Sequence, residues 1–213
     1  MPKRGPYNRT MAATTPPAHR GPTEHETRER ILAAAFEHFG QYGYDKTTVS
    51  DLSRAIGYSK AYIYRFFESK QAIGEAICSQ CLEKVVADAG IAAAEAGSSA
   101  EALRRLVRAI AAKGRELLDE HRKIYDVAAH SATERWGSYL SFERGVQLLV
   151  ERILQAGRDS GEFERKTPLD ESVRAILLVL QPFMNLAMLP HNPADFPQGA
   201  EEVTNLILRS LAP

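Results

Sequence analysis

The chain has little cysteine, with two residues among 213, which excludes a disulfide-stabilised fold. No apolar run reaches the roughly 18 residues that a membrane-spanning helix requires. The basic start, MPKRGPYNRT, is not followed by a continuous apolar stretch, so a secretory signal is not indicated. Together these absences predict a cytoplasmic, soluble protein with no membrane partner.

Motifs typical of enzymes are also missing. There is no Gly-rich phosphate loop, no Gly-x-Ser-x-Gly and no His-Glu-x-x-His, and the six histidines are scattered without ligand spacing. The sequence therefore predicts no enzyme, no cofactor and no metal site. A helical ligand-binding or interaction module without specific DNA binding is compatible with these absences.

The net charge of the chain is zero, since 27 basic residues balance 27 acidic ones, but the charges are unevenly distributed along the sequence. Residues 1–80 hold 11 Lys and Arg against 8 Asp and Glu, a net charge of +3. A positive N-terminal part suits contact with a polyanion. Residues 1–23 are basic and contain five prolines, so they are expected to form a flexible leader, either a solvated tail or part of that contact.

Strand patterning is missing as well. No segment alternates apolar and polar residues between hairpin turns, whereas apolar positions from Glu24 onward recur at helical spacing, as in Ile31, Ala35 and Phe39. We therefore expect an all-α fold. Two helical domains are expected, one over residues 24–84 and a second over residues 85–213.

The segment over residues 48–67 has the pattern of a helix-turn-helix. Thr48 is placed to cap a short helix that ends at Gly57, and Ser59 is placed to cap the next. In such a motif the first helix supports the second, whose polar side chains enter the major groove of DNA. The sequence thus predicts a partner, double-stranded DNA.

The second helix carries side chains suited to that groove. Lysine and arginine bind phosphates, tyrosine and threonine hydroxyls form hydrogen bonds, and an alanine methyl contacts a thymine methyl. Each of two residues has an alternative to DNA contact: Tyr64 could pack its ring on the core, and Arg65 could be an exposed, solvated side chain. The candidate DNA-binding residues are Thr47, Thr48, Ser59, Lys60, Ala61, Tyr62, Tyr64, Arg65 and Lys70.

Residues 27–77 resemble the DNA-binding domain of the TetR family of transcriptional regulators. The resemblance implies a three-helix domain, a fourth helix leading to a ligand-binding domain, and a homodimer that represses from a palindromic operator until a small molecule binds. It adds Thr27 to the candidates. Tyr62 departs from the family, which often has a small residue or threonine there. The matching residues are Thr27-Arg28, Ile31-Leu32, Ala35, Phe39, Gly43, Thr47-Thr48, Asp51-Leu52, Gly57, Ser59-Lys60, Ile63-Tyr64, Phe67 and Ser69-Lys70.

The second domain is predicted to hold an unknown effector, apolar or aromatic in character. Binding pockets are mostly apolar with a few polar anchors, although ordinary core packing is the alternative for each aromatic residue. Asn185 is a further possible anchor. The candidate lining residues are Tyr125, His130, Trp136, Tyr139, Phe142, Phe183, Met184 and Met188.

Two further features leave alternatives open. Helices expected around Thr167–Met188 and Gly199–Leu211 have wide apolar faces, which favour a dimer interface but also suit the core of a monomer. Cys78 and Cys81 share a helix face and form either a thiol switch or two small buried apolar residues.

Overall fold

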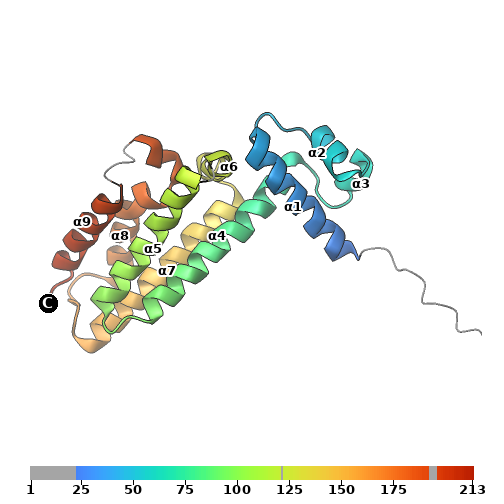
Figure 1. Cartoon of the computed structure of the whole chain (residues 1–213). Helices are drawn as coiled ribbons and strands as arrows, with labels where there is room; N and C mark the ends of the chain where they lie inside the picture. The colour runs from blue at the N-terminus through green and yellow to red at the C-terminus, as the bar shows by residue number, and fades with distance from the viewer. Residues whose placement is uncertain (1–22, 121, 192–195) are drawn as a thin grey trace, which may run out of the picture.

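The structure is a computed structural model that describes residues 23–120, 122–191 and 196–213 (Figure 1). Over those residues it is helical and contains no strand, which confirms the all-α prediction. None of the described helices is both long enough and apolar enough to cross a membrane. The predicted leader, apart from Thr23, lies outside the described residues.

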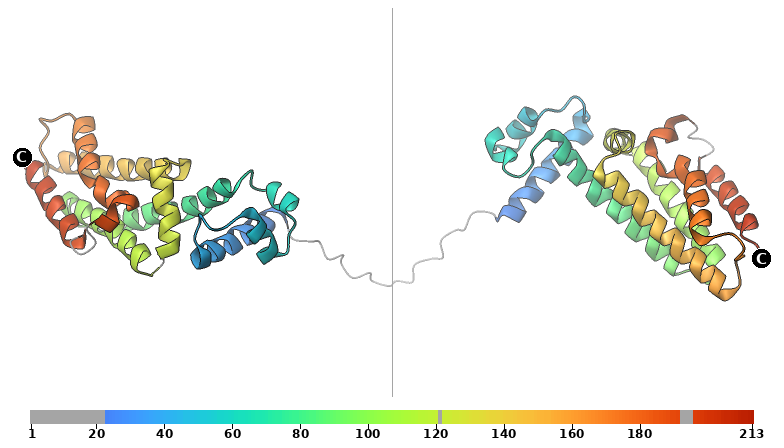
Figure 2. Two further views of the ribbon diagram at one scale, coloured as in Figure 1. Left: turned by 90° about the horizontal axis from the view of Figure 1, so that it is seen from above. Right: turned by 180° about the vertical axis from the view of Figure 1, so that it is seen from behind.

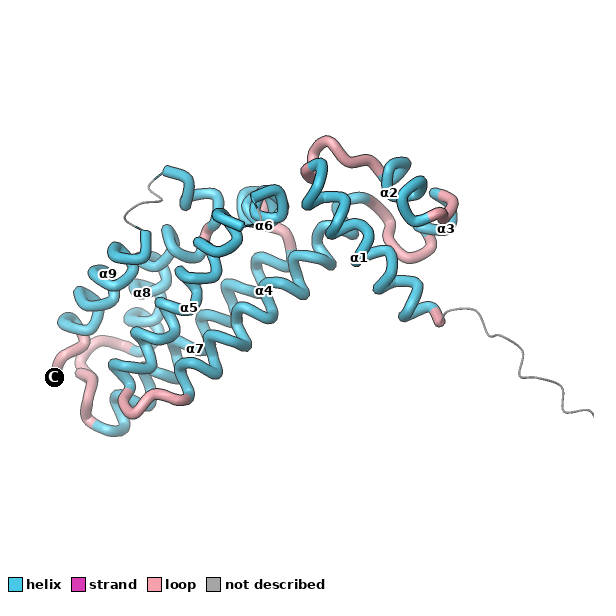
Figure 3. The backbone as a smooth tube through the Cα atoms, in the orientation of Figure 1, coloured by secondary structure: helices cyan, strands magenta, loops and turns pink. Residues whose placement is uncertain are grey.

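Three helices form the N-terminal part: α1 (Glu24–Tyr42), α2 (Val49–Ile56) and α3 (Lys60–Tyr64). They pack around side chains with no exposed surface, including Phe39, Leu52 and Ile63. The fourth helix, α4 (Lys70–Ala94), then runs out of this group and into the C-terminal bundle (Figures 1 and 3).

The C-terminal part is a bundle built on the distal half of α4. Helix α4 packs against α5 and α7, α5 also packs against α9, and α7 against α8 (Figure 2). Helix α6 contacts α1 and so joins the two parts. The bundle comprises α5 (Ser99–Glu120), α6 (Arg122–Thr133), α7 (Gly137–Ser160), α8 (Leu169–Met184), the 3-10 helix η1 (Leu186–His191) and α9 (Phe196–Ser210).

Local capping explains most helix starts. Thr23 and Thr48 form capping boxes with Glu26 and Asp51, and these boxes satisfy backbone N–H groups that lack an intrahelical partner. At the other end of α2, Gly57 adopts φ 77° and ψ 17°, a left-handed conformation that favours glycine.

The last helices differ from their predicted bounds. The helix expected to reach Met188 ends at Met184, because Asn185 is extended, and a 3-10 turn follows. Pro168 is the N-cap of α8, so the helix begins at Leu169, two residues after the expected Thr167. Helix α9 begins at Phe196, before the expected Gly199, since Pro197 lies in the first turn, where its missing N–H removes no helical hydrogen bond.

Candidate nucleic-acid interface

The turn between α2 and α3 is held by its own backbone and one side chain. The Gly57 N–H donates to the Ser53 carbonyl at 3.0 Å, and the Ser53 hydroxyl donates to the Tyr58 carbonyl at 2.6 Å. Ser59 then caps α3, because its hydroxyl accepts from the Tyr62 N–H at 3.1 Å. These bonds fix the direction in which α3 leaves the turn.

Helix α3 is anchored on one side and open on the other. Ile63 and Phe67 are 0% and 4% exposed, whereas Lys60, Tyr64 and Arg65 are exposed. Tyr64 is 48% exposed, so it does not pack into the core. Within the described chain, Lys60 has no ion pair or hydrogen-bond partner. The outer side of α3 therefore presents a free cation and a phenol.

Ala61 and Ser59 complete that outer side. Both are exposed, and the Ser59 hydroxyl keeps its capping bond while remaining accessible. The small Ala61 leaves room for close approach of a ligand to the backbone. Ser59, Lys60 and Ala61 are thus accessible as predicted.

Tyr62 occupies a different environment from the free phenol that the sequence suggested. Its half-buried ring lies between the rings of Tyr58 and Phe66, with centroid distances of 5.1 and 5.3 Å. The Arg65 guanidinium lies 5.5 Å from the same ring, and Arg30 of α1 lies 5.8 Å from Tyr58. Tyr58 and Phe66 were not predicted as part of this surface, although aromatic residues spaced by four mark one helix face.

Two threonine predictions need correction. Thr27 and Thr47 are each 1% exposed, so neither side chain is accessible to DNA. The Thr47 hydroxyl donates to the Gly43 carbonyl at 2.7 Å, and the Thr27 hydroxyl is buried without a partner within the described residues. Both threonines lie where the loop and α1 face the core, and the sequence motif alone does not reveal this.

Thr48 is exposed and participates in the cap of α2. Its backbone N–H and its hydroxyl both donate to the Asp51 carboxylate, at 2.9 and 2.6 Å. These hydrogen bonds lower the pKa of Asp51. The charged carboxylate therefore holds Thr48 in place at the start of the supporting helix.

Lys70 is bound within the protein. Its Nζ donates to the Tyr44 carbonyl at 3.0 Å and lies 4.1 Å from the centroid of the Tyr44 ring. Lys70 is half-buried and already paired, unlike the exposed Lys60. Its main observed role is to fasten the start of α4 to the loop after α1.

The residues predicted to line an effector pocket come from α6, from α7 and its N-cap, and from α8 and η1. Trp136 and His130 pack on Tyr44, at centroid distances of 5.7 and 5.4 Å, where the two parts of the chain meet. The Phe183 ring packs on Phe196 at 5.1 Å.

The remaining predicted pocket residues lie on α6, α7, α8 and η1. Tyr139 lies 6.1 Å from Phe142, centroid to centroid, and the Tyr125 hydroxyl donates to the Leu186 carbonyl. Met184 is buried, and Met188 is 46% exposed. The Asn185 side chain is engaged locally, accepting from the Ala187 N–H at 3.0 Å. Helical spacing predicts which residues share a helix face but not which faces meet, so whether these residues line one effector pocket stays a prediction.

Comparisons with known proteins identify the family of this chain. The family model described as "Bacterial regulatory proteins, tetR family" matches residues 31–77, which include α2, the turn and α3. A solved structure of the TetR-family transcriptional regulator PfmR from Thermus thermophilus is 30% identical over 86% of this chain and 100% of that one, with a TM-score of 0.60. The chain belongs to the TetR family.

This TetR-family transcriptional regulator is also similar to other known regulators. A helix-turn-helix transcriptional repressor from Mycobacterium tuberculosis is 40% identical over 60 residues, which are 28% of this chain and about a third (32%) of that protein. The FadR regulators from Bacillus halodurans and, in complex with stearoyl-CoA, from Bacillus subtilis share the fold, with TM-scores of 0.66 and 0.65. They are 21% and 18% identical, over 88% and 86% of this chain and 97% and 98% of theirs.

Over the described parts of the chain, no three His, Cys, Asp or Glu side chains gather as a metal site would require. The side chains of the candidate interface are cationic, phenolic and hydroxyl groups. Their accessible members lie along the start of α3 and the cap of α2.

Proposed function

We propose that this TetR-family protein is a cytoplasmic repressor without a catalytic step, which binds a palindromic DNA operator as a homodimer and releases it when a small molecule binds. The observation that carries the proposal is the outer side of α3. There Lys60, Tyr64 and Arg65 are exposed, while Ile63 and Phe67 hold the helix against the core. Residues 24–84 would form the DNA-binding domain and residues 85–213 the effector-binding and dimerisation domain.

The size of α3 supports twofold binding. A helix of five residues, Lys60–Tyr64, offers few side chains to a groove. Regulators of this type gain affinity and specificity by placing two such helices in successive major grooves, about one helical turn of DNA apart. A palindromic site follows from the twofold symmetry of the protein.

Helices α8 and α9 are the proposed dimer interface. Leu178 and Leu206 are 72% and 58% exposed, and Val179 is 45% exposed, although all three are large apolar residues. Covering them with the same helices of a second copy would remove this apolar surface from water. An interface of α8 and α9 also leaves α3 free at the other end of the molecule (Figure 1).

Repression and release are supported by relatives. The Mycobacterium tuberculosis relative is named a repressor, and the Bacillus subtilis FadR structure contains stearoyl-CoA. We propose that this chain also responds to a small apolar or amphipathic molecule. The buried aromatic residues of the bundle remain the candidates for an internal site that opens around such an effector.

Fluorescence anisotropy with duplexes from the promoter region of the protein's own gene tests the proposal. Specific binding should weaken steeply as salt rises, because phosphate contacts release counterions. Lys60→Ala should weaken binding to every duplex and reduce the salt slope by about 1. Lys166→Ala, which removes an exposed lysine from the loop between α7 and α8, is the matched control and should change neither quantity.

Tyr62 allows a separate test of base selection. Tyr62→Phe keeps the ring between Tyr58 and Phe66 and removes only the hydroxyl, so a change in the sequences selected from a random pool would assign readout to that hydroxyl. Equal affinity for operator and random duplex, with little salt dependence, would refute DNA-specific regulation. That result would instead favour a helical interaction module.

A further inference from the structure

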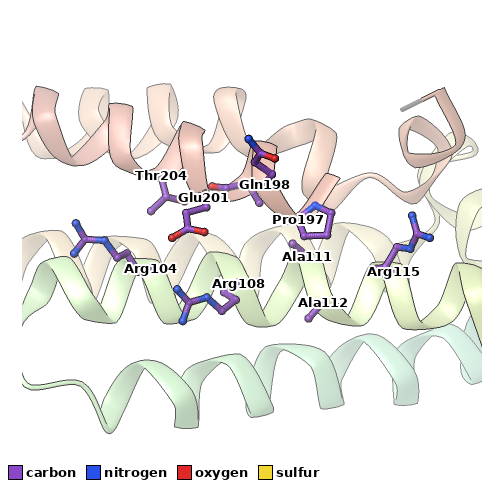
Figure 4. A pocket seen from close by; sticks show the side chains of 10 residues that line it. Arg104, Arg108, Ala111, Ala112, Arg115, Pro197, Gln198, Glu201 and Thr204 are labelled. Carbon is purple, nitrogen blue, oxygen red and sulfur yellow. Dashed lines mark hydrogen bonds between the residues drawn. The ribbon is translucent and has the colours of Figure 1, made fainter. Parts of the chain in front are cut away.

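A groove of about 660 Å³ lies between α5 and α9 (Figure 4). Arginines of α5 line one side of it, polar residues of α9 line the other, and small apolar residues form its floor. Its size is within the range of known ligand sites. The lining residues are Arg104, Arg108, Ala111, Ala112, Arg115, Pro197, Gln198, Ala200, Glu201 and Thr204.

Small side chains keep the groove open. Ala111 and Ala200 are 3% and 2% exposed, so the two helices are in close contact at these positions without filling the space above them. Thr204 is 2% exposed and its hydroxyl donates to the Ala200 carbonyl at 2.6 Å. The floor is therefore mostly apolar and offers one hydroxyl oxygen as a hydrogen-bond acceptor.

The charge in the groove is predominantly positive. Three arginines and a single carboxylate, that of Glu201, line it. Arg115 is bound to Asp119 at 2.6 Å. Arg104 and Arg108 form no ion pair or hydrogen bond within the described residues, and both interact electrostatically with Glu101 on their own helix. Arg104 and Arg108 are one helical turn apart, roughly 6 Å along α5.

We propose that this groove binds an elongated amphipathic anion: an alkyl chain that ends in a phosphate or carboxylate. The alkyl chain would lie along Ala112, Ala111 and Pro197, and the anionic group would bind Arg104 and Arg108. Two guanidinium groups one turn apart can share a phosphate or carboxylate through charge-assisted hydrogen bonds. None of the groove residues belongs to the aromatic set expected from the sequence, so this site is distinct from an internal pocket.

The charge distribution favours this occupant over a second copy of the chain. An apolar surface pressed onto the groove would remove Arg104 and Arg108 from water with Glu201 as the single carboxylate of the lining, so positive charge would be left without a counter-charge there, which is unfavourable. An amphipathic anion matches both the apolar floor and the excess positive charge.

Calorimetry on the full chain without DNA tests the site with three probes: decyl phosphate, decanoate and decanol, each below the concentration at which it aggregates. We expect saturable binding of one equivalent of decyl phosphate or decanoate per chain and much weaker binding of decanol. Which of the two anions binds more tightly identifies the preferred head group. Equal binding of decanol, or no saturable binding of either anion, would overturn the proposal.

Variants locate the binding in the groove. The double substitution Arg104→Gln and Arg108→Gln should weaken anion binding by at least about tenfold, while Arg152→Gln, which changes an exposed arginine of α7, should leave it unchanged. Ala112→Leu adds bulk at an exposed floor position and should weaken all alkyl probes without unfolding the helix. Binding that survives both groove variants would place the ligand elsewhere.

An effector role for this site rests on the proposed function, and a second assay separates the two. If decyl phosphate binds but leaves DNA affinity unchanged, the groove stands as a ligand site and its role as the effector site is refuted. If the chain binds no DNA at all, the calorimetry still decides whether the groove binds the anion.

Discussion

Gly157 provides a strong test of the packing that supports the C-terminal helices. A Cβ atom at this position of α7 would lie 2.1 Å from Cδ2 of Phe163, whereas ordinary contacts begin near 3.4 Å. Phe163 is 4% exposed, and its N–H donates to the Gly157 carbonyl at 3.0 Å. Because the backbone of Phe163 is held at this point, its ring can make room only by leaving its packed position.

The size of the effect follows from two opposing contributions. Replacing glycine by alanine inside a helix favours folding by about 1 kcal/mol. Overpacking costs about 1–3 kcal/mol, and displacing a buried phenylalanine ring loses part of another 1.5–3 kcal/mol or so. Gly157→Ala should therefore lower the free energy of unfolding by about 2 kcal/mol.

The sign should reverse once the ring is removed. In a Phe163→Ala background, itself destabilised by about 3–5 kcal/mol, Gly157→Ala meets no obstacle and should raise the free energy of unfolding by up to about 1 kcal/mol. The two substitutions should thus show a coupling energy near 3 kcal/mol.

Urea unfolding followed by circular dichroism measures these free energies. Gly40→Ala is the matched control, because its Cβ would lie 3.7 Å from Ile124, an ordinary contact, and it should stabilise the protein by about 0.5–1 kcal/mol. If Gly157→Ala costs the same with and without the Phe163 ring, the steric argument is wrong.

Two further predictions concern association and thiol chemistry. The double substitution Leu178→Glu and Leu206→Glu should give monomers in sedimentation velocity, because it places charges in the proposed interface. The control Leu140→Glu, at an exposed leucine of α7, should leave the protein dimeric. Dimers that persist in the double variant would contradict an interface of α8 and α9. Burial raises the pKa of Cys78 to about 12 and also raises the pKa of Cys81. Both thiols should therefore react slowly with a disulfide reagent at pH 7.5, and peroxide should not alter the affinity for DNA. Rapid labelling, or loss of DNA binding in peroxide, would support a thiol switch instead.

Features fixed by neighbouring residues could be predicted from the sequence. Thr48, Ser59 and Ser69 each cap a helix through a hydroxyl that accepts an N–H three residues later. Such bonds depend only on residue type and local spacing, so the helix-turn-helix and the exposed side of α3 follow from a short segment. The buried positions of Ile63 and Phe67 follow from the same spacing.

Features that depend on distant contacts could not be predicted. The Glu162 carboxylate accepts from the N–H groups of Ser99 and Ala100 at 2.7 and 2.9 Å, more than 60 residues away, and so caps α5. Likewise, Ala111 of α5 and Ala200 of α9 both line the groove, and nothing near either residue in the sequence marks them as parts of one site.

The dipeptide Ser-Lys shows where local sequence stops determining function. It occurs at the start of α3 as Ser59-Lys60 and at the start of α4 as Ser69-Lys70, with the serine as N-cap both times. Lys70 is bound to Tyr44, 26 residues earlier, whereas Lys60 is exposed and has no partner within the described chain. A cation that already has a hydrogen bond and an aromatic contact gains less from a phosphate than one that is only solvated. The same dipeptide therefore fastens one helix to the domain and leaves the lysine of the other accessible, and the contact with Tyr44 makes the difference between the two.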